Sequence, residues 1–144
     1  MNQKLSLVGV FLAVLTACGA ERTSEPPVAG RWYTASQVSK GEALFDAHCV
    51  SCHGPRASGL ADDWRKTDSA GNYPPPPLNG TAHAWHHPLE MLEKTLAEGG
   101  AEFGGLMPGF SASLTRDERL ASIAYFQSLW PAEIYTKWAQ INAR

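Results

Sequence analysis

The stretch Cys49-Val50-Ser51-Cys52-His53 decides which fold this sequence can adopt. Two thiols three residues apart in one turn can reach both vinyl groups on one edge of a porphyrin, and the next imidazole then lies under the iron. Cys-x-x-Cys-His is therefore the attachment signature of c-type haem, with His53 as an axial iron ligand. We expect one covalently bound haem, held by Cys49 and Cys52, around which the chain folds.

Other uses of a Cys-x-x-Cys pair are a zinc site and a thioredoxin-like redox centre. Zinc would need further ligands at motif spacing, and the sequence holds no second Cys-x-x-Cys. A thioredoxin-like pair would need a βαβ pattern around Cys49, which the sequence lacks. The histidine that directly follows the second cysteine favours haem over both alternatives.

The first residues read as an export signal. Lys4 supplies positive charge, and the apolar run 5–15 is shorter than the roughly 20 residues that a spanning helix needs. Leu-Thr-Ala-Cys18 resembles the lipobox of bacterial lipoproteins, which implies that residues 1–17 form a signal peptide and that Cys18 is lipidated. The alternative is an unmodified Cys18 in a soluble secreted protein. With lipidation and haem attachment, all three cysteines are accounted for.

Length and charge limit the remaining possibilities. Residues 18–35 contain few apolar groups and are expected to form a flexible tether, although Trp32 and Tyr33 should pack on the domain. Residues 36–144 have the size of one domain. A formal charge of −2 offers no basic field for nucleic acid, so we expect no nucleic-acid partner.

Apolar residues recur at three- and four-residue spacing in several segments, and no segment alternates as a strand would. Ser36 is the predicted N-cap of the first helix and Pro88 the first residue of the second, while Thr115 and Glu118 have the spacing of a capping box. Residues 56–80 and 101–112 are predicted loops. The predicted helices run from about 37 into the cysteine segment, from Pro88 to before Gly99, from Thr115 to Pro131, and through the tail 131–144.

Between about residues 37 and 130 the sequence resembles class I cytochromes c. Gly41-x-x-x-Phe45 ahead of the cysteines, with Tyr125 on the last core helix, is similar to the contact between terminal helices in that family. The resemblance implies an all-α cytochrome c fold, in which three core helices and long loops surround one haem. The loop from Trp64 to Tyr73 and a helical extension after residue 131 depart from the family's compact members.

Two loop motifs resemble further parts of that family. Pro76-Pro77-Leu78-Asn79-Gly80 is similar to a Pro-x-Leu-x-Gly segment, which implies that the Pro76 carbonyl, or that of Pro77, accepts the second N–H of His53. Met107 lies in a glycine- and proline-rich loop where the family carries its axial methionine, and a soft thioether there would raise the potential. Met107 could instead fill the core, a role that suits Met91 more naturally.

His83, His86 and His87, with Trp85 between them, form a second cluster of interest. These histidines could contact a haem propionate, supply the sixth iron ligand, or bind copper. Trp64, Tyr73 and Trp85 are candidates to border the haem, with core packing as the alternative.

These features predict an electron-transfer protein rather than an enzyme. We expect a single-electron carrier, lipid-anchored at the periplasmic face of a bacterial membrane, with redox proteins of the cell envelope as partners. The alternatives are a haem-based redox or gas-binding enzyme subunit, which would need an open sixth iron position, and a copper-handling accessory protein that uses the histidine cluster.

Overall fold

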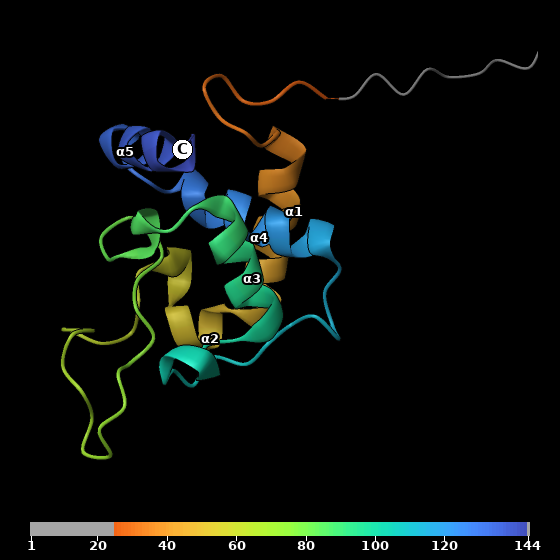
Figure 1. Cartoon of the computed structure of the whole chain (residues 1–144). Helices are drawn as coiled ribbons and strands as arrows, with labels where there is room; N and C mark the ends of the chain where they lie inside the picture. The colour runs from red at the N-terminus through yellow and green to blue at the C-terminus, as the bar shows by residue number, and fades with distance from the viewer. Residues whose placement is uncertain (1–24, 144) are drawn as a thin grey trace, which may run out of the picture.

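The computed structural model describes residues 25–143, and the predicted signal peptide and Cys18 lie outside them. Within that part the chain is helical and contains no strand, which confirms the predicted all-α fold (Figure 1). No helix among the described residues has both the length and the apolar character needed to cross a bilayer. The elements are α1 (Ala35–His48), α2 (Val50–His53), η1 (Pro55–Ala57), η2 (Ala84–His86), α3 (Leu89–Glu98), η3 (Ala101–Phe103), α4 (Arg116–Ser128) and α5 (Ala132–Asn142).

The first helix starts earlier than predicted, because Thr34 and not Ser36 is its N-cap. The Thr34 hydroxyl accepts the Gln37 N–H at 3.2 Å, and the Gln37 side chain accepts the Thr34 N–H at 2.9 Å. The Ser36 hydroxyl donates instead to the carboxylate of Glu25. The helix also ends sooner than expected, at His48, so the cysteine motif occupies the separate short helix α2.

Helix α1 packs directly on α4, and a glycine allows the close approach. A Cβ atom at Gly41 would overlap the carbonyl oxygen of Ala121 and would lie 3.0 Å from Cβ of Tyr125. One turn further along α1, the rings of Phe45 and Tyr125 lie 5.3 Å apart. The contact implied by the family resemblance is therefore present.

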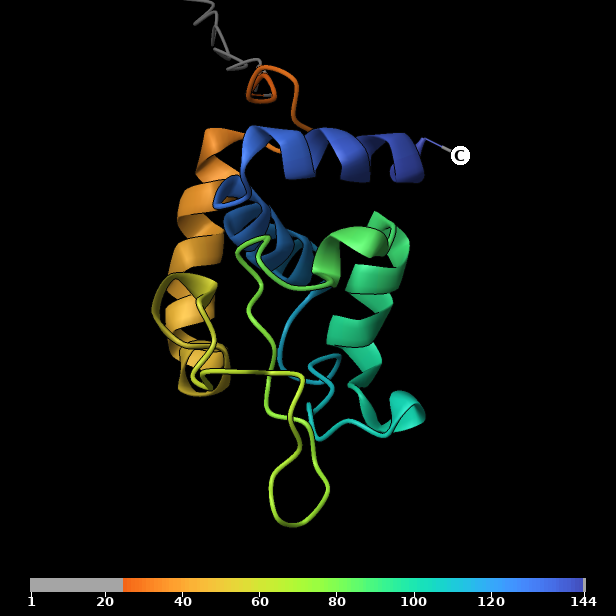
Figure 2. The ribbon, with the colours of Figure 1, turned by 90° about the vertical axis from the view of Figure 1, so that its left-hand side faces the viewer.

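Helix α3 covers another side of α4, so that α4 passes between α1 and α3 (Figure 2). It begins at Leu89, one residue after the predicted start, because Pro88 has an extended ψ of 161° and is the N-cap. Gly99, with a φ of +89°, ends the helix as expected. Leu92 and Leu96 form its buried face.

A largely buried ion pair between Arg119 and Glu93 joins α4 to α3. Nε and Nη2 of Arg119 lie 2.8 Å and 2.7 Å from the same carboxylate oxygen of Glu93, and Nη1 donates to the Leu114 carbonyl at 2.5 Å. The side chains of Arg119 and Glu93 are only 11% and 14% exposed. The pair thus ties the loop before α4 to both helices.

We expect Arg119→Met to lower the free energy of unfolding of the holoprotein by about 3 kcal/mol, because Glu93 would keep a largely buried charge without a partner. Lys40→Met is the matched control. Lys40 lies 3.3 Å from Glu118 with its side chain 54% exposed, so its loss should cost less than about 1 kcal/mol. Denaturant melts of both variants measure the difference, and equal losses would contradict the stabilising role of the buried pair.

Helix α5 and the segment before α1 meet in an aromatic cluster that is part of the hydrophobic core. Tyr33, Trp130, Tyr135 and Trp138 are all buried, with neighbouring rings 5.2 to 6.5 Å apart. Nε1 of Trp32 donates to the Gln127 side chain at 2.6 Å. Trp32 and Tyr33 thus pack on the domain, as expected from the sequence.

Candidate functional site

The cysteine motif is wound into a single turn. The Cys49 carbonyl accepts the N–H of Cys52 at 3.1 Å and that of His53 at 2.9 Å, which sets both thiols and the imidazole on one short helix. Cys52 is exposed, Cys49 is half-buried, and the two do not form a disulfide. The His53 side chain is buried at 7% exposure. This arrangement leaves one thiol near the surface and directs the imidazole inward.

The tautomer of His53 is set by one hydrogen bond. Its Nδ1 lies 2.8 Å from the Pro76 carbonyl oxygen, which can only accept, so Nδ1 carries the proton and Nε2 keeps a free lone pair. Burial lowers the pKa of His53 and outweighs the opposing effect of this hydrogen bond. The imidazole is therefore held in the neutral form that binds metals, with Pro76 rather than Pro77 as its acceptor.

Backbone contacts hold the loop around this histidine. The N–H groups of Leu78 and Asn79 donate to the Ala57 carbonyl at 2.8 Å and 3.2 Å, and the Gly59 N–H donates to the His53 carbonyl at 2.7 Å. Gly59 has a φ of +79°, and a Cβ there would lie 3.0 Å from Cγ of Pro77. The close packing of the segment 57–59 on the segment 77–79 fixes the position of the Pro76 carbonyl relative to His53.

A cavity of about 310 Å³ opens beside Cys52. Its walls are mostly apolar, which suits the face of a flat hydrophobic cofactor. Leu60 on its rim is 63% exposed. The lining residues are Ser51, Cys52, Leu60, Ala61, Pro74 and Pro75.

Met107 lies on a loop that is pressed against the end of α3. Its carbonyl accepts the Gly100 N–H at 2.9 Å, and a Cβ at Gly99 would lie only 2.6 Å from the same oxygen. A Cβ at Gly109 would lie 2.7 Å from the Ala97 carbonyl, so both glycines are needed for this path. The Met107 side chain is half-buried against the core. The loop is thus held in place at the carbonyl of Met107 itself and at the residues that follow it.

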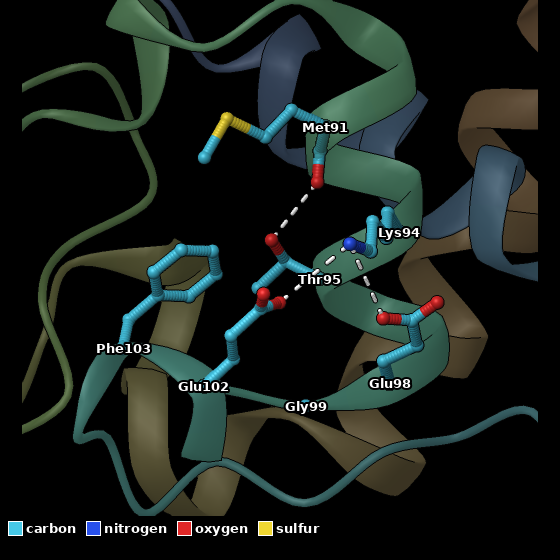
Figure 3. Close-up of a pocket in the computed structure, with 7 residues that line it drawn as sticks. All are labelled: Met91, Lys94, Thr95, Glu98, Gly99, Glu102 and Phe103. Atoms are coloured by element: carbon cyan, nitrogen blue, oxygen red, sulfur yellow. Dashed lines mark hydrogen bonds and ion pairs between the residues drawn. The ribbon is translucent and has the colours of Figure 1, made fainter.

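Met91 occupies a different environment. It lines a cavity of about 120 Å³ between α3 and η3, and its thioether extends from the helix into this space (Figure 3). Among the lining residues, Lys94 pairs with Glu98 and Glu102 at 3.6 Å each. Met91 is half-buried and lies outside the buried core, in contrast to the core-filling role that its helical position favoured.

The three histidines of the second cluster do not converge. The His83 ring lies 5.1 Å from Trp64 and 5.6 Å from His87, whereas His86 stacks on Trp85 at 3.7 Å. Among residues 25–143, no group of three or more histidine, cysteine or acidic side chains could hold a metal ion. The geometry of the described chain therefore gives no support to a copper site.

The aromatic residues expected to border the haem are not brought to the cavity beside Cys52. Trp64 and Trp85 pack on histidines of the second cluster, and Tyr73 is 67% exposed. None of the three lines that cavity. The prediction that they border the haem stays untested.

Residues 36–126 match the protein family described as cytochrome C oxidase, cbb3-type, subunit III. The chain belongs to this family. It is also similar to cytochrome c-551 of Bacillus subtilis (strain 168), with 36% identity over 64 residues. That segment covers 42% of this chain and 57% of the relative, so the chain spans little more than half of the relative's length. No solved structure matches the chain.

As a cytochrome of this family, the chain carries covalently bound haem c. Its residues fit this cofactor, because two thiols and a neutral imidazole share one turn beside an apolar cavity. Burial, with a smaller contribution from Cys52, raises the pKa of the Cys49 thiol to about 11. The reactive thiol of Cys-x-x-Cys oxidoreductases has a lowered pKa instead, so the direction of this pKa shift disfavours a thioredoxin-like centre.

The sequence patterns did not predict a role for Trp130, which contacts the loop that holds His53. Nε1 of Trp130 donates to the Leu78 carbonyl at 2.7 Å, two residues beyond Pro76. A buried tryptophan has an N–H in need of an acceptor, which is a signal that could have singled it out. Its partner lies 52 residues away in the chain, so the sequence alone could not have named it.

Proposed function

We propose that this cytochrome is a single-electron carrier of the cell envelope, with Cys49 and Cys52 forming thioether bonds to its haem and His53 and Met107 binding the iron. The observation that carries the proposal is the hydrogen bond from Nδ1 of His53 to the Pro76 carbonyl, which leaves Nε2 as the ligand atom. When bound, the haem supplies one-electron chemistry through its ferric and ferrous states.

The chain's own residues set the conditions for this chemistry. The thioether bonds keep the cofactor in place without relying on affinity, and the Pro76 carbonyl orients His53 and raises its basicity. The Met107 thioether is a soft ligand that stabilises ferrous iron. The glycine-rich loop presses its backbone against α3 and so presents Met107 in a fixed position. With both axial positions filled, the cytochrome would pass electrons without binding a substrate.

The proposed location follows from residues outside the described part of the chain. A signal peptide over residues 1–17, lipidation of Cys18 and a tether that starts at residue 18 would hold the domain at the periplasmic face of a bacterial membrane. Trp32 and Tyr33 pack on the domain, so the free part of the tether would end before them. Redox proteins of the envelope are the proposed partners. The family takes its name from a cbb3-type oxidase, so a terminal oxidase is one candidate electron acceptor.

Covalent attachment is tested with Cys49→Ser and Cys52→Ser combined, expressed in a host competent for haem ligation. We expect the wild type to keep its pigment on denaturing electrophoresis and the double variant to lose it, because only thioether bonds survive denaturation. Ser51→Ala, which changes the residue between the cysteines, should keep the pigment. A colourless wild-type band would contradict the proposal.

A further inference from the structure

The Trp130 indole contacts the loop that holds His53. Trp130 is 3% exposed, lies beyond the end of the family match at residue 126, and donates from Nε1 to the Leu78 carbonyl. Leu78 lies two residues after Pro76, whose carbonyl accepts the His53 Nδ1–H. The end of α4 is thereby linked, through one short loop segment, to the proximal histidine.

Both polar groups of Leu78 are engaged. Its N–H donates to the Ala57 carbonyl at 2.8 Å, and its carbonyl accepts from Trp130 at 2.7 Å. Ala57 is fully buried and follows the cysteine motif by only a few residues. Leu78 is therefore held between the segment after His53 on one side and Trp130, two residues past the end of α4, on the other. Without the indole, the Leu78 backbone would keep its hydrogen bond to Ala57 and lose the one that its carbonyl accepts.

The backbone after Leu78 is shaped to receive the indole. Gly80 has a φ of +93°, and a Cβ there would lie 3.2 Å from Cδ1 of Trp130 and 3.1 Å from Cδ of Pro131. Any side chain at this position would push against the ring that makes the hydrogen bond. The glycine thus permits the close contact between the loop and the end of α4.

We propose that Trp130 is a positioning residue for the axial histidine: by holding the Leu78 carbonyl, it keeps the Pro76 carbonyl in place against the Nδ1–H of His53. This inference rests on the proposed role of His53 as an iron ligand. A persistent hydrogen bond at Nδ1 makes the imidazole a stronger electron donor, which favours ferric iron and lowers the potential. Loss of the Trp130 contact loosens that bond and raises the potential.

The test compares Trp130→Phe with Trp138→Phe in the holoprotein. Trp138 is equally buried, and its Nε1 donates to the His87 carbonyl at 2.8 Å, so both variants lose an aromatic N–H bond to a backbone carbonyl. Only the Trp130 bond ends on the loop segment that contains Pro76, the hydrogen-bond acceptor of His53. We expect Trp130→Phe alone to raise the midpoint potential and to speed hydrogen exchange of the His53 Nδ1–H about fivefold, measured by NMR.

A second variant separates the loss of the hydrogen bond from the loss of packing that Trp130→Phe also causes. Replacement of Trp130 with benzothienylalanine keeps the shape of the ring and exchanges its N–H for sulfur. It should reproduce the faster exchange and the raised potential. Equal exchange rates and potentials in this variant, in Trp138→Phe and in the wild type would overturn the inference. A wild type without bound haem would instead refute the proposed function on which it rests.

Discussion

Met107→Ala should lower the midpoint potential of the holoprotein by on the order of 0.1 V, as expected for the loss of an axial thioether from a haem. The thioether stabilises ferrous iron more than the water or vacant position that would replace it. The same change opens a coordination site, so the reduced variant should bind carbon monoxide within the mixing time of the experiment. A redox titration followed by optical spectroscopy measures the first effect, and the carbon monoxide difference spectrum measures the second.

Met91→Ala is the matched control, because it removes the same thioether from the cavity between α3 and η3. It should leave the potential and the carbon monoxide spectrum close to those of the wild type. An unchanged potential in Met107→Ala would refute Met107 as a ligand, and a fall in Met91→Ala would point to Met91 instead. Rapid carbon monoxide binding by the wild type itself would favour the alternative of a gas-binding or catalytic haem protein.

The parts of the molecule that were predictable are those decided by neighbours in sequence. The Cys-x-x-Cys-His motif acts within one turn, and the capping box of α4 joins Thr115 to Glu118 at 3.0 Å and 3.3 Å. Both depend on residues at most four apart, so their spacing in the sequence is already their spacing in space. The Pro76 contact was predictable for another reason, since it came from resemblance to a family.

Other features depend on partners that the sequence does not identify. Thr34 and Ser36 are both good N-caps, and the Ser36 hydroxyl is engaged by Glu25, eleven residues earlier. The Arg119 pair with Glu93 spans 26 residues, and the Trp130 contact with Leu78 spans 52. The helix position of Met91 suits a core-filling role, but the path of the chain through η3 leaves a cavity beside it. Tertiary packing decided each of these cases.

Gly41→Ala should lower the free energy of unfolding of the holoprotein by about 3 kcal/mol, although the same change at an open helix position would raise it by about 1 kcal/mol. The added Cβ would overlap the Ala121 carbonyl, which belongs to the backbone of α4 and cannot turn aside. The two helices would have to separate, and the packing of Phe45 on Tyr125, with rings 5.3 Å apart, would loosen. Denaturant unfolding monitored by circular dichroism measures the loss.

Ser39→Ala is the control, because it lies on the exposed side of α1 and adds no atom to the contact with α4. Its stability should match that of the wild type within about 0.5 kcal/mol. A Gly41→Ala variant as stable as Ser39→Ala would mean that the helices do not approach as closely as described. Because α1 ends at the residue before Cys49, separation at Gly41 would also shift the start of the haem-binding turn. We therefore expect the potential of this variant to change together with its stability, whereas Ser39→Ala should change neither.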